Sequence, residues 1–235
     1  MHTQHDDRDI LPGAVTKTPP KSNASSLTML KASAGPNELV FTRIGPWRIN
    51  MEISTKNQPE NTLYSIDIAG LFSDNTEITM YSGSKKENRV LGHCRFNKFR
   101  PSEMQISSHG TSSRMIWIKQ HDSYRWSVPQ KSEAGEKTET MDEKYFLWKT
   151  VEYPASSSGN RVYQNLELGD MDNSTVYAAY SGGAPGTKSG GSLLLREDMG
   201  EDMITMAVLT VCGLIEKERQ TRARKGNFTI GMLAY

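Results

Sequence analysis

Residues 200–226, GEDMITMAVLTVCGLIEKERQTRARKG, decide the fold of this chain. Ten of the thirteen residues in 203–215 are apolar, and at the helical repeat they leave no polar face. A helix that is apolar on every side is surrounded by protein or by lipid. Because a bilayer span needs about 20 apolar residues, this run is too short to cross a membrane. The sequence therefore predicts a helix buried inside the domain.

Both ends of this segment carry charges that suit a helix. Glu201 and Asp202 fall in the predicted first turn, where negative charge is favourable for the helix dipole. Gly226 is a residue type at which helices commonly stop. The basic residues toward that end are Lys217, Arg219, Arg222, Arg224 and Lys225. We predict a helix over 200–225 whose basic end leaves the core, because buried unpaired charges are prohibitive.

The composition suits one large domain with a disordered part. The chain has 235 residues, of which 23% are charged and 36% hydrophobic, and its formal net charge is +1. This balance does not indicate a nucleic-acid partner. The N-terminus lacks the basic-then-apolar pattern of a secretory signal, so a cytoplasmic protein is expected, with unconventional secretion left open. Cys94 and Cys212 are predicted to be buried free thiols.

The apolar pattern divides the chain into an arm and a domain rich in strands. Residues 1–38 are rich in Ser, Thr, Pro, Lys and Asp without sustained periodicity, which predicts a disordered N-terminal arm. From Leu39 onward apolar and polar residues alternate, as is typical of half-buried strands. We expect twelve strands, over 39–44, 48–54, 62–69, 76–82, 89–96, 103–109, 114–120, 124–128, 145–152, 161–168, 175–181 and 192–196. Segments 129–143 and 182–191 are predicted to be loops.

Twelve strands followed by one fully apolar helix favour a particular architecture. Short connections favour antiparallel neighbours. A barrel of about twelve strands is too wide to be filled by its own side chains, and a helix that is apolar on all faces could fill it. A two-sheet sandwich with the helix packed against it is the alternative, but it would expose one side of the helix. We predict a mainly β fold, a closed antiparallel barrel over 39–226 enclosing the C-terminal helix, followed by a tail over 227–235.

This order of elements resembles a known superfamily. A dozen antiparallel strands followed by a hydrophobic helix ending in Glu-Lys-Glu-Arg (216–219) is similar to the tubby C-terminal-like superfamily, which includes tubby proteins, LURP-one-related proteins and phospholipid scramblases. Segments 176–180 (VYAAY), 192–196 (SLLLR) and 203–219 resemble uncharacterised fungal members. The resemblance covers about 39–225 and implies a barrel around a central helix. Since tubby proteins bind phosphoinositides through basic residues of the barrel, it also implies a lipid-binding role.

Two basic clusters are candidate sites for an anion. Lys85, Lys86 and Arg89 lie in a predicted turn between strands, where three cations could meet a phosphoinositide head group or an acidic membrane surface. The alternative is that they keep a hairpin soluble. The second cluster comprises Arg219, Arg222, Arg224 and Lys225 near the end of the helix. Its alternative role is compensation of the helix dipole.

Other patterns give little support for catalysis. The run GGAPGTKS (182–189) differs from a P-loop because Thr187 separates glycine from Lys188, and a strand rather than a helix follows. His93 and Cys94 are neighbours in a strand pattern, so they point to opposite faces and cannot form a dyad. The histidines lack metal-ligand spacing, and no metal or cofactor is expected. The four tryptophans are interpreted as packing residues.

The sequence therefore favours a non-enzymatic binding module that acts on an acidic membrane surface or on a protein partner. A barrel filled by its own helix would leave no central cavity for a substrate. Two further hypotheses stay open: a scramblase-like membrane protein whose helix inserts into lipid, and an enzyme with a surface cleft.

Overall fold

The computed structural model describes residues 37–45, 49–70, 76–84, 89–97, 99–100, 102–119, 123–129, 143–151, 165–171, 175–183 and 187–232, and for 129 and 224–232 it describes the backbone alone. The predicted disordered arm lies outside the described residues except for its last two positions. Most of the predicted 129–143 loop and the basic pair Lys85 and Lys86 also lie outside them.

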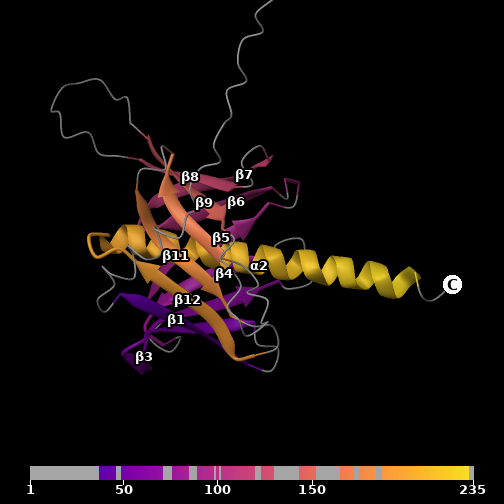
Figure 1. Cartoon of the computed structure of the whole chain (residues 1–235), viewed down its shortest axis with the longest axis horizontal. Coiled ribbons are helices and arrows are strands. Elements are labelled where there is room, and N and C mark those ends of the chain that lie inside the picture. Colours follow the sequence, from indigo (N-terminus) through magenta and orange to yellow (C-terminus); the bar gives the residue numbers. More distant parts are fainter. Residues whose placement is uncertain are drawn as a thin grey trace, which may run out of the picture.

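Twelve strands form one closed barrel, and a single long helix follows them (Figure 1). The strands are β1 (Glu38–Ile44), β2 (Asn50–Thr55), β3 (Gln58–Ala69), β4 (Glu77–Ser82), β5 (Val90–Phe96), β6 (Glu103–Ser108), β7 (Thr111–Ile118), β8 (Ser123–Pro129), β9 (Glu143–Thr150), β10 (Asn165–Asp170), β11 (Val176–Gly182) and β12 (Ser189–Leu195). The helix is α2 (Glu201–Met232). The predicted barrel with a C-terminal helix is thus confirmed.

Strands that follow one another in the chain are neighbours in the barrel. Each strand pairs antiparallel with the next one in the chain, and β1 closes the barrel by pairing with β12. Alternation along each strand sends one set of side chains inward. In β6, for example, Met104 and Ile106 are fully buried while Gln105 between them is exposed. All twelve predicted strands correspond to an observed one, because alternation of this kind is a direct consequence of the pleat.

The glycine-rich stretch before β12 was predicted wrongly in part. The predicted 182–191 loop includes Ser189, Gly190 and Gly191, which belong to β12. Gly190 is buried against Phe41, and a Cβ added to it would lie 2.8 Å from the Phe41 Cβ. Glycine is therefore needed here for close packing within a strand, whereas sequence reasoning took it as a sign of a loop.

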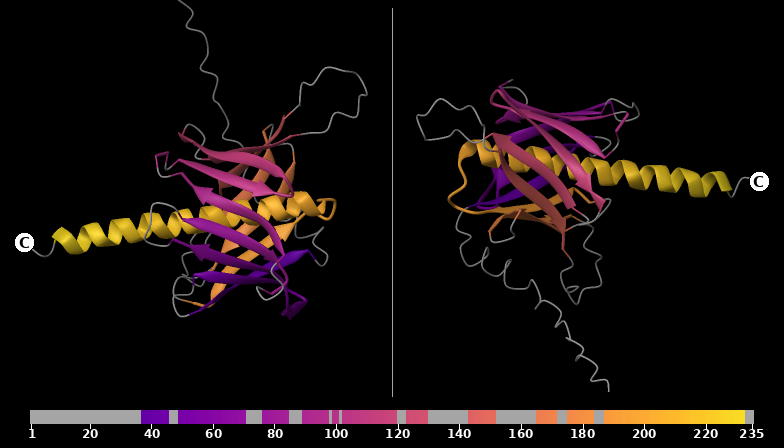
Figure 2. Two further views of the ribbon diagram at one scale, coloured as in Figure 1. Left: turned by 180° about the vertical axis from the view of Figure 1, so that it is seen from behind. Right: turned by 90° about the horizontal axis from the view of Figure 1, so that it is seen from above.

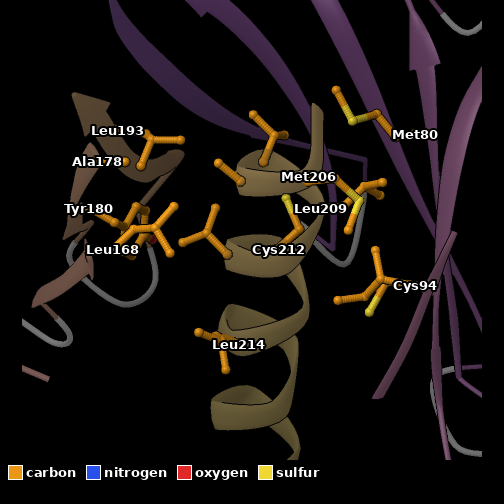
Figure 3. Packing of buried hydrophobic residues seen from close by; sticks show 14 of the residues in the cluster. Met80, Cys94, Leu168, Ala178, Tyr180, Leu193, Met206, Leu209, Cys212 and Leu214 are labelled. Carbon is orange, nitrogen blue, oxygen red and sulfur yellow. The ribbon is translucent and has the colours of Figure 1, made fainter. Parts of the chain in front are cut away.

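Helix α2 fills the barrel, as its apolar surface predicted. Every residue from Thr205 to Leu214 is buried. Figure 3 shows Met206, Leu209, Cys212 and Leu214 of the helix between strand residues on two sides: Leu168, Ala178, Tyr180 and Leu193 on one, Met80 and Cys94 on the other. At Gly213 a Cβ would lie 3.0 Å from the Cys94 Sγ. The absence of a side chain therefore lets the helix approach β5 closely.

One pair of polar side chains and the two thiols inside the barrel have a physical account. Trp148 Nε1 donates a hydrogen bond to Thr210 Oγ1 at 2.8 Å, and Thr210 Oγ1 lies 2.8 Å from the carbonyl oxygen of Met206. Cys94 and Cys212 are buried and free, as predicted. Burial raises the pKa of the Cys94 thiol to about 12, so both the packing and the chemistry favour an inert thiol there.

The predicted end of the helix at Gly226 is wrong. Helix α2 continues to Met232, and Figures 1 and 2 show it passing through the barrel and projecting well beyond it. A glycine inside a helix costs only about 1 kcal/mol relative to alanine, so Gly226 does not have to stop it. No basic residue lies in the last turn. The basic cluster therefore ends seven residues before the last residue of the helix, outside its last turn.

Candidate anion-binding site

The structure describes one member of the first predicted basic cluster. Arg89 is exposed at the hairpin between β4 and β5, and its carbonyl oxygen accepts a hydrogen bond from the Ser82 N–H at 2.9 Å. Its position at the surface is compatible with an anion contact. Lys85 and Lys86 lie outside the described residues, so the cluster as a whole stays a prediction.

The second predicted cluster has carboxylate partners on its own helix. Arg219 Nε and Nη2 each lie 2.6 Å from an oxygen of Glu216, a carboxylate that is only 1% exposed. Arg222 Nε lies 2.7 Å from an oxygen of Glu218. Arg224 and Lys225 lie in the helix, and their side chains are outside the described residues. Two of the four cations are thus engaged within the helix, which weakens the case for this cluster as an anion site.

A third group of basic residues lies on the outer wall of the barrel, over strands β5 to β9. It surrounds a hollow of about 740 Å³, which we call the arginine groove. Its charged lining residues are Arg95, Arg100, Arg114, Arg125, Glu103 and Glu143. Four arginines and two glutamates give the groove a formal charge of +2, against +1 for the whole chain.

The register of the sheet places these side chains beside one another. Gln105 of β6 lies directly opposite Arg95 of β5 and Arg114 of β7, so these three side chains form one outward row. Since neighbouring strands lie about 4.8 Å apart, the backbones of Arg95 and Arg114 are separated by about 10 Å. In the adjacent row Ile116 pairs with both Glu103 and Arg125. The groove is therefore a surface of several strands and not a sequence motif.

The four arginines differ in how far they are already paired. Arg95 Nε lies 3.0 Å from Glu77 Oε1, and Arg100 Nη1 lies 3.2 Å from Glu103 Oε1. No carboxylate of the described residues lies within ion-pair distance of Arg114 or Arg125. Arg114 and Arg125 are consequently the cations of this wall that are best placed to meet an external anion.

Tyr145 gives the groove an aromatic edge. The Arg125 guanidinium carbon lies 5.3 Å from the centre of the Tyr145 ring, a distance that fits a cation–π contact. A hydrogen bond with Glu143 raises the pKa of the Tyr145 hydroxyl, so it stays protonated near neutral pH. Tyr145 is 39% exposed and could present both its ring and its hydroxyl to a ligand.

Sequence reasoning did not find the arginine groove. Arg95, Arg114 and Arg125 each lie in a predicted strand, and none of them belongs to either predicted basic cluster. Their arrangement on one wall follows only when the register of four neighbouring strands is known. A helical wheel or a linear cluster search cannot reveal it, because about 10 to 20 residues separate them along the chain.

Comparison with protein-family models, with curated proteins and with solved structures found no match. Within the described ranges, no helix is both long and apolar enough to cross a membrane. In the same part of the chain, no group of three or more His, Cys, Asp or Glu side chains is arranged to hold a metal ion. His93 and Cys94 point to opposite faces, as predicted: Cys94 is buried, whereas His93 Nδ1 lies 3.0 Å from Glu77 Oε1 at the surface.

Proposed function

We propose that this protein is a non-enzymatic binding module that docks on membranes containing phosphoinositides through the arginine groove. The observation that carries the proposal is the pair Arg114 and Arg125, which face a hollow of net positive charge without a carboxylate partner among the described residues. A guanidinium presents a planar set of donors that matches phosphate oxygens, so arginine is well suited to bind a phosphorylated head group.

The dimensions of the groove favour a ligand with more than one phosphate. Its volume of about 740 Å³ lies within the range of roughly 300–1,000 Å³ typical of small-molecule sites. Arginines in two adjacent rows could contact separate phosphates on one ring. The aromatic edge at Tyr145 would meet the ring itself. This arrangement supports docking at the surface of a membrane, and the cytoplasmic location stays a prediction.

The proposal agrees with the resemblance to the tubby-like superfamily, which remains a hypothesis because no comparison matched the chain. It replaces the two predicted clusters by a third as the main anion site. The scramblase-like hypothesis requires α2 to leave the barrel, although residues 205–214 of the helix are buried there. Two alternatives from the sequence stay open for the groove. It could bind an acidic protein partner, or it could be the surface cleft of an enzyme.

Liposome co-sedimentation tests the proposal. Vesicles of phosphatidylcholine with and without a few per cent of phosphatidylinositol 4,5-bisphosphate would be compared at low and moderate salt. Each cation at an acidic surface contributes about 1 kcal/mol, so replacing Arg114 and Arg125 by glutamate should lower the partition coefficient about thirtyfold or more. Binding should also weaken as salt rises, because salt screens exposed charges.

A matched control carries the same charge change elsewhere on the surface. Lys119 and Lys188 are exposed and lie outside the groove, so their double glutamate variant should lose much less binding. Equal losses in the two double variants would indicate general electrostatic attraction and would contradict a site in the groove. Variants of Lys85, Lys86 and Arg89, and separately of Arg222, would test the two clusters predicted from the sequence.

A further inference from the structure

A second pocket lies at the end of the barrel where α2 begins, apart from the arginine groove. Its volume is about 490 Å³. The start of the helix, the β6–β7 hairpin and the adjoining ends of β8, β9, β11 and β12 line it, and we call it the barrel-end pocket. A Cβ added to Gly200 at its side would meet nothing within 4 Å, which agrees with open space there.

The inner part of the pocket is apolar. Three methionines of one short segment, Met199, Met203 and Met206, line it together with Phe146 and Val128. Met206 and Phe146 are 3% and 4% exposed, so they form its floor. Methionine is flexible and polarisable, and a surface rich in it adapts to flexible apolar ligands. Pockets lined mainly by apolar side chains with a few polar groups are typical of sites for small molecules.

The mouth of the pocket holds two cations and two carboxylates, Lys144, Arg196, Asp198 and Asp202, so its formal charge is zero. Arg196 forms a bidentate ion pair with Asp198. Lys144 Nζ lies 3.0 Å from the Tyr177 hydroxyl and 5.1 Å from the centre of its ring. No carboxylate of the described residues lies within ion-pair distance of Lys144.

The two faces of β9 separate this pocket from the arginine groove. Glu143 and Tyr145 point outward and line the groove, whereas Lys144 and Phe146 point inward and line the pocket. This alternation follows from the pleat of the strand. A change at Lys144 can therefore alter the pocket while leaving the side chains of the groove in place.

We propose that the barrel-end pocket binds a single-chain anionic amphiphile, a long-chain carboxylic acid. Its hydrocarbon chain lies against Met199, Met203, Met206 and Phe146, and its carboxylate meets the Lys144 ammonium at the mouth. The pocket has an apolar floor and, at its mouth, an ammonium with no carboxylate of the described residues at ion-pair distance, which matches the division of such a molecule into chain and head. The Tyr177 hydroxyl, which already contacts Lys144, is a second group within reach of the carboxylate.

Binding of cis-parinaric acid, a fluorescent fatty acid, tests the inference on the full-length protein. We expect saturable binding that palmitate displaces at concentrations below its critical micelle concentration. Replacing Lys144 by glutamine removes the charge but keeps a polar side chain. This change should weaken palmitate about tenfold or more, since hydrogen bonds to charged groups are the strong ones, and should change displacement by hexadecanol less than about twofold.

Two further variants make the result decisive. Met203→Trp fills the apolar part and should weaken palmitate and hexadecanol alike, with circular dichroism used to confirm that the variant folds. Lys188→Gln, an exposed lysine outside the pocket, should leave both unchanged. The inference fails if the fatty acid shows no saturable binding, or if Lys144→Gln and Lys188→Gln behave alike. A groove variant, Arg114→Glu with Arg125→Glu, should bind fatty acid normally, so failure of the proposed membrane docking and failure of this inference are distinguishable.

Discussion

The two halves of helix α2 lie in different surroundings. From Thr205 to Leu214 every residue is buried inside the barrel, whereas Thr221, Arg222 and Ala223 are exposed. Figure 2 shows the C-terminal part of the helix projecting beyond the barrel. Between them Glu216 is buried, with Arg219 and Gln220 bonded to it. The inner half is helical because the barrel encloses an apolar surface. Among the described side chains of the outer half, Arg222 pairs with Glu218, and an exposed pair of this kind contributes only about 0.3–0.5 kcal/mol.

Introducing a charge into the inner half of the helix should lower the stability of the protein more than any other change considered below. Leu209 is fully buried, and Leu209→Asp would place a carboxylate among apolar side chains with no partner. The expected cost exceeds about 5 kcal/mol, which is comparable with the whole stability of a typical domain. Circular dichroism should show loss of the cooperative thermal transition.

The same kind of change in the outer half serves as the control. Thr221→Asp adds one carboxylate at an exposed position of the same helix. Its Tm should stay within a few degrees of the parent protein. If both variants melted like the parent, the inner half would not be the enclosed core of the barrel.

An intermediate effect is expected where the helix leaves the barrel. Arg219→Leu would remove the cation from the buried Glu216 carboxylate and leave it the Gln220 amide, which lies 2.9 Å from its Oε1. Removing one member of a buried pair should lower the free energy of unfolding by about 2–3 kcal/mol. Urea denaturation would measure this change.

Arg222→Leu is the matched control for that change, since the Arg222–Glu218 pair is about 40% exposed on both sides. Exposed pairs of this kind contribute at most about 0.5 kcal/mol. If the two variants lost similar free energies of unfolding, the Glu216 carboxylate would be no more enclosed than that of Glu218. The two parts of the helix would then not differ in their surroundings at this point.

The smallest effect is expected from shortening the outer half. Deletion of 224–235 removes helix beyond the last described side chains, which are exposed at 221–223. The unfolding temperature of the barrel should change by less than about 3 °C, because a surface change typically alters stability by at most about 0.5 kcal/mol. A large fall in differential scanning calorimetry would mean that the outer half contributes to the barrel after all.

The sequence was sufficient for the strands, the barrel and the buried helix because these depend on local periodicity. Alternation in 103–108 is visible without any partner strand, and the apolar run in 203–215 excludes an exposed helix by itself. The same local reasoning was wrong at Gly226 and at 189–191. Glycine has no side chain whose polarity would indicate burial or exposure. Only the packing in the folded protein therefore shows whether a glycine ends an element or allows a close approach.

Tertiary structure alone decided which charges of different strands meet on the wall of the barrel. Register across β5, β6 and β7 brings Arg95 and Arg114 onto one wall, although 18 residues separate them in the chain. Glu216 and Arg219 are neighbours on any helix because three positions separate them, but only the barrel buries the Glu216 carboxylate and so changes the meaning of a cluster that looked free in sequence. Periodicity determines which face of an element is apolar, because that is a property of neighbouring residues. The electrostatic environment of a side chain is a property of distances in space, which only the closed barrel fixes.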